Sequence, residues 1–544
     1  RDGSVRVAFH GGLGEIGRNC ATIEIDGSIA MVDAGLMFPE EDMLGVDLVL
    51  PDYSSVTDRG DSLSFVALTH GHEDHIGSLG YLLRERNVPV YGTALTMELA
   101  NARVSELGVD GDFRAVETGT WVEHGKFRFA FIPVTHSVPD ATGIAFETPE
   151  GIIVHTGDFK LDPTPIDGVI TDLQSFAGFG RRGVRLMLAD STNAERPGVV
   201  ESEKTVGVRI GELVHEAEGR VLIACFASHL HRVQQSIDAV VADGRKFAFI
   251  GRSMLRISEI AGQIGVLRIP EESLVELNDL LKLPPKQTAV ISTGSQGEPF
   301  AALSLMAAGE HRSIALDPTD TVIISATPIP GNEKRVSRVI NNLARVGVTV
   351  HHGRNTHVHV SGHAAAEELK VLYNVVQPEA VVPVHGEHRH LLANAEIARS
   401  VGVPEVAVCE DGDVVVLEDG EMRVDRGAVS SGYIYVDGLE VGGDEGVLRD
   451  RRHLADDGVI LITVGVDVRN GDIVFGPDVD SHGVTGDSRE LHDAVQARVV
   501  QGIETLERPI DPDALRSRIR NSARKAVQSH IKRRPVVFPV VIKV

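Results

Sequence analysis

The chain has 544 residues and a formal net charge of -25, and it is 42% hydrophobic, 24% charged and 4% aromatic. At roughly 100–200 residues per domain, this length argues against a single compact domain and predicts two to four. The few aromatic residues argue against large base-stacking platforms. The acidity argues mildly against nucleic-acid binding, although net charge does not decide what one groove can bind.

The three cysteines, Cys20, Cys225 and Cys409, are scattered and form no C-x-x-C pair. This usage indicates reduced thiols and predicts a cytoplasmic protein without a disulfide framework. No apolar run approaches the ~18 residues that a membrane span needs. No signal peptide is visible either, so we expect no membrane association.

Residues 1–35 read as three short strands, VRVAFH, NCATIEID and SIAMVDAG. The GGLGEIG stretch between the first two contains Gly12-x-Gly14-x-x-Gly17, which has the spacing of a dinucleotide-binding fingerprint. That fingerprint must open a helix, whereas CATIEID alternates as a strand does. We therefore favour a glycine-rich hairpin turn that lets the backbone approach a site.

A strand-like run, SFVALT, leads directly into THGHEDHIG at 69–77. There His70, His72, Asp74 and His75 crowd into six positions. Imidazole and carboxylate together suit Zn²⁺ or Mn²⁺, and four such ligands can serve two ions. The alternative is a solvated histidine loop, but such loops seldom carry the H-x-H-x-D-H order.

Three further candidate ligands also follow apolar runs. His136 lies in PVTHSVPD, Asp158 in VHTGDFK and His385 in VVPVHGEH. Taken singly, each reads as an ordinary loop or N-cap residue. Taken with 69–75, they predict a two-metal site at one rim of a sheet, where strand ends deliver their side chains.

From about residue 203 the pattern becomes a regular alternation of strands and helices, which is typical of a parallel α/β module. Histidine-rich segments resume only at 351–390, so the module splits the metal-binding domain. A Gly/Asp/Glu-rich patch, GLEVGGDEG, then precedes a last α/β region. The expected boundaries are 1–202 and 346–430 for the split domain, 203–345 for the insertion, 431–448 for a linker and 449–544 for a C-terminal domain.

The H-x-H-x-D-H motif, followed by a strand-end histidine and a strand-end aspartate, resembles the metallo-β-lactamase superfamily. The inserted module and the later histidine motifs resemble its β-CASP branch of nucleases. With SSGYIYVD at 430–437 and RRPVVFPVV at 533–541, the whole chain is similar to the ribonuclease J family. The resemblance implies an αββα core, split by a parallel α/β β-CASP domain and followed by a small α/β domain.

This resemblance also implies two Zn²⁺ ions per subunit, with Mn²⁺ as the alternative. One ion would bind His70, His72 and His136. The other would bind Asp74, His75 and His385, and Asp158 would bridge the two ions.

Three more residues match family motifs with catalytic roles. Asp33 in MVDAG and Asp190 in LADSTNAE would orient ligand histidines. His363 in HVSGH would act as a general acid or as a donor to phosphate oxygens. A structural role for His363 at a helix N-terminus is compatible with this.

Three segments are candidates for substrate contact. QTAVISTGSQGEP, 287–299, reads as strand, glycine turn and helix, and its Ser295 and Glu298 fit a capping box. An ordinary capped helix is the alternative to a phosphate cradle. The resemblance places this segment and HVSGH beside a nucleotide channel that could accept a 5′ monophosphate. The candidates are Ser295, Gln296 and Glu298; His359, Val360, Ser361, Gly362 and His363; and Ser228, His229 and Arg232.

The function that this implies is a two-zinc ribonuclease that cuts RNA internally and degrades it 5′→3′, in RNA processing and mRNA decay. Its partners would be single-stranded RNA, a second copy in a homodimer or homotetramer, and RNA-decay proteins. The alternatives are a DNA-directed β-CASP nuclease, a small-molecule metallo-hydrolase and an inactive scaffold. By analogy His385, where DNA-preferring branches have valine, speaks against the first, and the inserted module speaks against the second.

Overall fold

The computed structural model describes residues 3–298, 300–329, 331–442, 445–484, 488–531 and 533–543. Its chain divides into two compact units, one formed by residues 1–38 and 48–434 and the other by 39–47 and 435–544. None of its described helices is long and apolar enough to cross a membrane.

The first unit contains two sheets that face each other. Their strand orders are β23-β22-β1-β3-β4-β6-β7-β8 and β21-β19-β13-β12-β11-β10-β9. The first sheet has the bounds Glu421–Asp425, Val414–Glu418, Val5–Gly11, Cys20–Ile25, Ser28–Val32, Leu63–Ala67, Pro89–Gly92 and Asp112–Ala115. The second has Glu405–Val406, Ala380–Val384, Val184–Asp190, Gly151–His155, Thr142–Thr148, Phe127–Pro133 and Trp121–His124.

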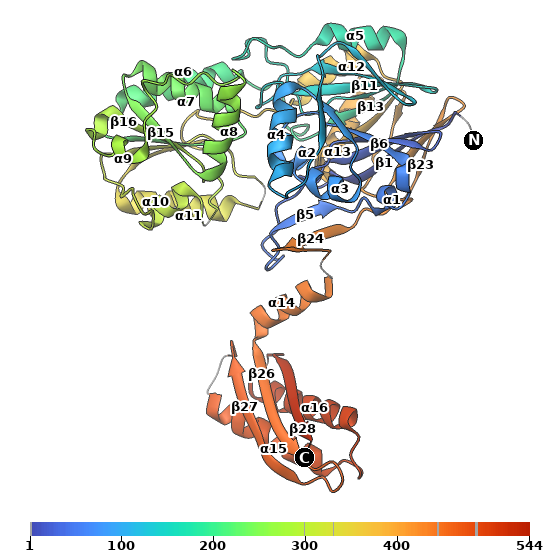
Figure 1. The fold of residues 1–544 in the computed structure, drawn as a ribbon, viewed down its shortest axis with the longest axis vertical. Coiled ribbons are helices and arrows are strands. Elements are labelled where there is room, and N and C mark those ends of the chain that lie inside the picture. The colour runs from blue at the N-terminus through green and yellow to red at the C-terminus, as the bar shows by residue number, and fades with distance from the viewer. Residues whose placement is uncertain are drawn as a thin grey trace. The chain divides into compact units, whose positions relative to one another are not determined.

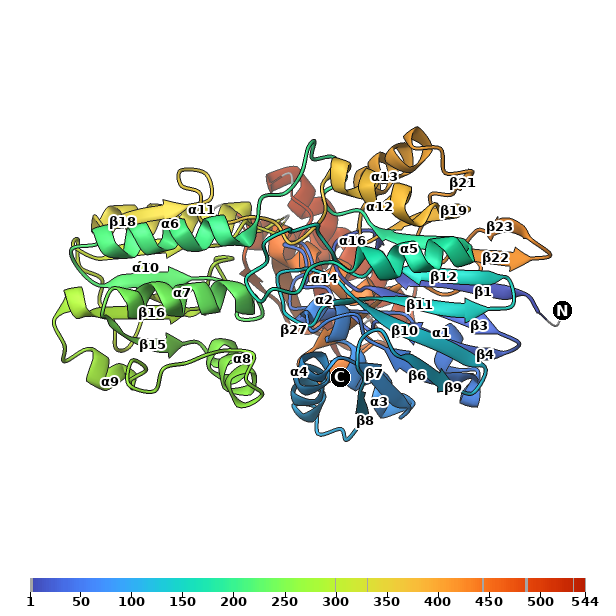
Figure 2. The same cartoon turned by 90° about the horizontal axis from the view of Figure 1, so that it is seen from above.

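A buried apolar layer joins these sheets. Phe65 of β6 stacks on Phe129 of β10 with ring centroids 4.7 Å apart, and Phe129 lies 5.7 Å from Phe146 of β11. Helices cover the outer faces: α3 (Leu79–Glu85) and α4 (Ala94–Ser105) on the first sheet, and α5 (Leu173–Arg182), α12 (Ala366–Val376) and α13 (His388–Ser400) on the second. The expected αββα core is confirmed (Figure 2).

The inserted domain forms a separate lobe of this unit, drawn in green and yellow in Figure 1. Its five strands are all parallel, in the order β15-β16-β14-β17-β18, with bounds Lys246–Ile250, Thr288–Ser292, Val221–Ala224, Thr321–Ile324 and Thr349–His352. Helices α6 (Glu203–Glu216) and α7 (Leu230–Ala242) pack on one face, and α10 (Ala302–Ala308) and α11 (Glu333–Val346) on the other. Both strand faces are therefore buried, which is the usual state of a parallel sheet.

The insertion leaves the second sheet after β13 and returns to it as β19. These two strands pair in parallel, and Asp190 lies opposite Val384. Residues almost two hundred positions apart in the sequence therefore leave the same sheet edge side by side.

The glycine-rich segment after β1 is a turn and opens no helix. Strand β1 pairs antiparallel with β3, and the short β2 (Leu13–Gly14) pairs with β20 (Gly386–Glu387), directly after His385. Gly12 has φ +94°, and a Cβ there would lie 2.5 Å from Asn19. The hairpin interpretation is confirmed, and no dinucleotide fold forms at this position.

The second unit has its own core beneath a three-stranded sheet, β27-β26-β28, formed by Ile473–His482, Val459–Val466 and Val536–Lys543. Helices α15 (Ser488–Glu504) and α16 (Pro512–Ile531) pack on this sheet. The segment expected to be a linker, 431–448, carries β24 (Tyr433–Asp437), β25 (Glu440–Val441) and the start of α14 (Glu445–Asp457). The expected domain boundaries stay a prediction.

Candidate metal centre

The site lies where parallel strands of both sheets end. In the first sheet β4 and β6 run parallel, and Asp33 and the 69–75 loop follow them. In the second sheet Asp158 follows β12, Asp190 ends β13 and His385 follows β19. Because carboxyl ends of parallel strands meet at one edge, these distant segments converge.

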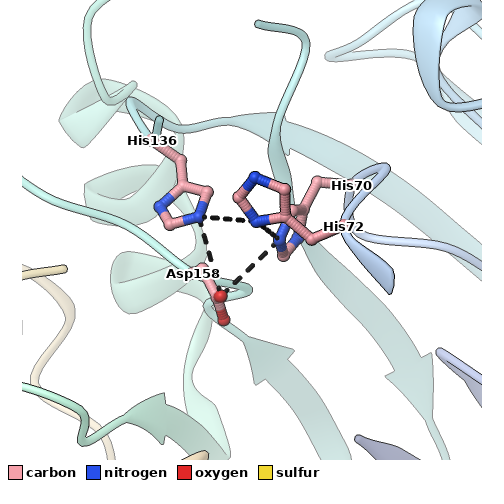
Figure 3. Close-up of side chains that lie close together, drawn as sticks. All are labelled: His70, His72, His136 and Asp158. Atoms are coloured by element: carbon pink, nitrogen blue, oxygen red, sulfur yellow. Dashed lines mark hydrogen bonds and ion pairs between the residues drawn. The ribbon is translucent and has the colours of Figure 1, made fainter. Parts of the chain in front are cut away.

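One group consists of His70, His72, His136 and Asp158, whose ligand atoms all lie within 4.8 Å of one another. The Nδ1 of His72 lies 3.0 Å from Nε2 of His70 and 3.2 Å from Nε2 of His136. The Oδ2 of Asp158 lies 3.5 Å from His70 Nε2 and 3.7 Å from His136 Nε2. The three rings and the carboxylate face a common point (Figure 3).

A second group shares the same aspartate and contains Asp74, His75 and His385. The Oδ2 of Asp158 lies 3.2 Å from His75 Nε2 and 3.4 Å from His385 Nε2. The Oδ2 of Asp74 lies 3.5 and 3.3 Å from the same two atoms. One carboxylate therefore lies between two sets of three side chains.

Residues outside both groups fix the ligand rings. The Nδ1 of His75 donates to Asp33 Oδ2 at 2.7 Å. The hydroxyl of Thr69 donates to the same Asp33 oxygen at 2.8 Å and lies 3.0 Å from His70 Nδ1. Because each Nδ1 is engaged on the outer side, each Nε2 is the ring nitrogen that faces the centre. The sequence predicted this role for Asp33 but missed Thr69.

A similar arrangement surrounds Asp190. Its Oδ2 accepts from His363 Nδ1 at 2.8 Å, and its Oδ1 accepts from the Thr192 hydroxyl at 2.9 Å. The Thr192 oxygen lies 2.6 Å from Nδ1 of His385. Asp190 thus orients a ligand through Thr192, which the sequence did not reveal, and also holds His363 beside the centre.

The electrostatics match neutral imidazole ligands in the first group. Burial lowers the pKa of His70, His72 and His136, that of His72 to about 4. These rings are therefore neutral at pH 7, and their inward nitrogens are available to a cation.

The second group carries the opposite charge pattern. Burial would raise the pKa of the Asp158 carboxyl, but His385, His75 and His70 outweigh it and hold the pKa well below the usual value. Burial also lowers the pKa of His385, yet Asp158 and Asp74 raise it to about 9. The buried carboxylates thus favour a positive charge at this position. Imidazole and carboxylate together form a ligand set that Zn²⁺ and Mn²⁺ accept.

Two residues of the site have left-handed backbone conformations. Asp33 has φ 61° and His385 has φ 56°. Such conformations cost of order 1–3 kcal/mol for a non-glycine residue and are concentrated at functional sites. In both cases the residue directly follows a buried strand, so the turn aims its side chain inward.

The HVSGH loop, 359–363, lies against the first group. The Nδ1 of His136 donates to Gly362 O at 2.8 Å, and a Cβ at Gly362 would lie 2.8 Å from that Nδ1. Val360 is buried, and Ser361 Oγ accepts the His363 backbone N–H at 3.2 Å. Glycine is therefore required where the loop touches a ligand ring.

The 226–232 segment reaches the same loop only in part. The rings of His229 and His359 lie 6.3 Å apart; His229 Nε2 lies 3.4 Å from Glu203 Oε1, whereas His359 Nδ1 has no hydrogen-bond partner among the described residues. Ser228 is half-buried. Arg232 is wholly buried, and its guanidinium binds Glu203 at 2.5 Å and Val358 O at 2.8 Å. The expected substrate contact by Arg232 is therefore corrected to a structural role.

The helix expected to begin at Ser295 begins later. Helix α10 has Ala301 as its N-cap residue, without a side-chain cap, so Ser295 and Glu298 form no capping box there. Gln296 is buried and donates to Thr327 O at 3.0 Å, whereas Glu298 is exposed. The glycine turn follows β16 as expected, but the helix-terminal phosphate cradle predicted from these residues is not formed.

Four family models match the chain in succession. They are the metallo-beta-lactamase superfamily over 13–189, the ribonuclease J beta-CASP domain over 218–343, the Zn-dependent metallo-hydrolase RNA specificity domain over 347–406 and the ribonuclease J C-terminal domain over 446–544. Together they cover both sides of the insertion and the second unit.

Full-length relatives are also similar. The chain is 42% identical to ribonuclease J of Mycobacterium tuberculosis over all of this chain and 98% of that protein. It is 37% identical to ribonuclease J2 of Bacillus subtilis over 99% of each. A crystal structure of a protein of unknown function from Enterococcus faecalis aligns with 76% of this chain and 100% of its own, with a TM-score of 0.54 and 17% identity. That likeness concerns the fold alone.

Proposed function

The chain belongs to the ribonuclease J family and is a metal-dependent ribonuclease of RNA processing and decay, and from that premise we propose that it holds two Zn²⁺ ions. Mn²⁺ is the alternative, since both ions accept nitrogen and oxygen ligands. The observation that carries the proposal is the convergence of two ligand groups on Asp158. The ligands would be His70, His72 and His136 for one ion, Asp74, His75 and His385 for the other, and Asp158 for both.

When bound, two such ions lower the pKa of water and stabilise negative charge on the phosphate. The chain's own residues position the ligands and supply a proton to the leaving 3′ oxygen. We assign that proton to Nε2 of His363, because Nδ1 is engaged by Asp190. Burial disfavours the charged form of His363, but Asp190 outweighs it and raises the pKa above the usual value, which suits a general acid.

The preferred substrate in this proposal is single-stranded RNA with a 5′ monophosphate. The HVSGH loop would read that phosphate with Ser361 and His359, together with His229 and Ser228 across the lobe boundary. Supporting this, the buried Nδ1 of His359 has no hydrogen-bond partner among the described residues, and an unpaired buried polar group is costly unless a ligand or water satisfies it. The remaining candidates for substrate contact in this proposal are Ser295, Gln296 and Glu298, in the turn after β16.

We further propose a cytoplasmic enzyme that assembles as a homodimer or homotetramer and works with RNA-decay proteins. The three free cysteines, all buried, agree with a reducing compartment. Sedimentation of the metal-loaded protein tests the assembly.

The test of the activity is one gel assay. Metal-loaded protein receives a 5′-labelled RNA in monophosphate and triphosphate forms, beside the matching DNA. Release of labelled mononucleotide from the monophosphate RNA alone supports the phosphate pocket and 5′→3′ degradation. Internal fragments from both RNAs would assign chiefly endonuclease action and remove the pocket. Survival of both RNAs at full metal occupancy would contradict the nuclease assignment for this chain.

A further inference from the structure

A basic groove lies on the inserted domain, apart from the metal centre. It has a volume of about 520 Å³ and is formed by α11 and the turn after β18. Four of its side chains are cations, and Glu333 is its single acid. The cations are Lys334, Arg338, Arg345 and Arg354, and all four are exposed. We call these four residues the groove cations.

The helix presents three of these cations along one face. Lys334, Arg338 and Arg345 are spaced by four and seven residues, which places them on the same side of a helix. At 1.5 Å per residue, the row extends about 17 Å. The opposite side of α11 is anchored by buried Val339 and Leu343 in the core of the domain, so packing holds the row toward solvent.

The groove cations lack carboxylate partners. No ion pair joins any of them to an acid in the part of the chain that the structure describes, and Arg345 donates to the neutral amide of Asn342 at 2.7 Å. Several other cations of this domain are paired, among them Arg209 with Glu212 at 2.6 Å and Lys282 with Asp279 at 2.7 Å. Four unpaired cations in one groove are notable in a chain of net charge -25.

The groove's lining indicates the chemistry of its partner. Besides the charged residues it contains Ser337 and Asn341, and no apolar or aromatic side chain. Protein interfaces usually have aromatic or apolar anchors at their centre, and base recognition in single strands uses aromatic stacking. Cations with hydroxyl and amide groups instead suit phosphate oxygens, independently of sequence.

We propose that this groove binds the phosphodiester backbone of the RNA that lies outside the catalytic centre. The inference rests on the proposed function, because an enzyme that degrades RNA from one end cuts repeatedly without dissociation only if it retains the remaining chain. The groove would raise affinity for long RNAs and leave the chemistry of hydrolysis unchanged.

The test compares Arg338→Gln/Arg345→Gln/Arg354→Gln with a matched control. The control, Arg209→Gln/Arg268→Gln/Lys282→Gln, removes the same charge from the same domain, but at cations paired with carboxylates. Binding is measured by fluorescence anisotropy over a salt series. The probe is a hydrolysis-resistant phosphorothioate RNA of about 30 nucleotides, longer than the ~4–16 nucleotides that one module covers.

Affinity falls as salt rises, and each phosphate contact contributes roughly 0.7 to the steepness of log affinity against log salt. We expect this slope to be shallower by about 2 in the groove variant, because three contacts are lost. The control should keep the wild-type slope, and all three proteins should hydrolyse a short RNA at equal rates. That last assay tests the proposed function separately from the groove.

Four outcomes would overturn the proposal. An unchanged slope in the groove variant, or an equal loss in the control, would show that no specific backbone contact exists there. Equal loss of short-RNA hydrolysis and long-RNA binding would show that the substitutions act on the catalytic centre. Polyglutamate bound by wild type but not by the groove variant, with RNA affinity unchanged, would assign the groove to an acidic protein segment.

Discussion

Asp158 belongs to both ligand groups of the metal centre. Its Oδ2 atom lies within 3.7 Å of the Nε2 atoms of His70, His75, His136 and His385. The Oδ2 atom of Asp74, by contrast, lies near the Nε2 atoms of two of these histidines, His75 and His385. Loss of the two carboxylates should therefore have different consequences.

We expect the Asp158→Asn variant to lose both metal ions per chain and the Asp74→Asn variant to lose one. Both changes keep the side-chain volume, so cavity effects are small. Elemental analysis after gel filtration, with circular dichroism to check the fold, gives the stoichiometry. Equal metal content in the two variants would contradict the shared position of Asp158.

A second titratable cluster lies at the turn after β1. Arg18 is buried, and its guanidinium contacts Glu15 Oε1 at 2.7 Å and Asp411 Oδ2 at 3.2 Å. Burial, together with the Glu15 carboxylate, raises the pKa of Asp411 to about 8. One guanidinium therefore serves two carboxylates, and the second of them binds a proton.

This raised pKa predicts a pH-dependent stability. The unfolded carboxyl has a pKa near 3.9, so between about pH 4 and 8 the folded state holds a proton that the unfolded state has lost. Stability contributed by Asp411 is thus present at low pH and lost as pH rises toward 8. Asp411→Asn should lack this loss, so its melting temperature relative to wild type should rise between pH 6 and 8.5. A constant difference across that range would contradict the shift.

At the scale of elements, Arg232 ties α7 to its neighbours in the inserted domain. Its guanidinium pairs with Glu203 at the start of α6 and donates to Val358 O before the HVSGH loop. Burial would raise the pKa of Glu203, but Arg232 outweighs it and holds the pKa well below the usual value. The two helices and the loop therefore share one buried ion pair.

Arg232→Met should destabilise the inserted domain by about 3–5 kcal/mol, because it removes the guanidinium that pairs with the buried Glu203 carboxylate. Adding Glu203→Gln should recover part of that loss. Thermal unfolding measures both, with Arg209→Met, at an exposed ion pair, as a control expected to change stability by at most about 1 kcal/mol. No recovery in the double variant would argue that packing, not charge, dominates at Arg232.

At the scale of the molecule, the two units have separate cores. All the candidate metal groups found among the described residues lie in the unit formed by 1–38 and 48–434. The 435–544 part has its own buried cluster from its sheet and its two long helices. Ligand binding stabilises only the fold that contains the site.

Chelation should therefore lower one unfolding transition and leave the other in place. Differential scanning calorimetry of the full chain, with and without a chelator, measures both transitions. Added Zn²⁺ should restore the original temperature of the transition that the chelator lowers. A shift of both transitions by the same amount would show that the two units unfold together.

Much of the site was predictable because its signals are local. H-x-H-x-D-H, a histidine and an aspartate after strands, and the alternation of the inserted domain are all short-range patterns, and the αββα core was predicted from them by resemblance. The prediction of a helix beginning at Ser295 was wrong because it also relied on a local pattern. The capping pattern is outweighed by the buried contacts of Gln296, which hold this turn in another conformation.

The sequence by itself determined which chemical groups this protein has and which strands end in them. Tertiary structure alone decided which groups meet. It joined Asp190 to His363, at 2.8 Å across 173 residues, buried Arg232 instead of leaving it for substrate, and brought Arg354 beside the row of cations on α11. Strand pairing and burial depend on contacts between distant segments, and the spacing of residues along the chain carries little information about them.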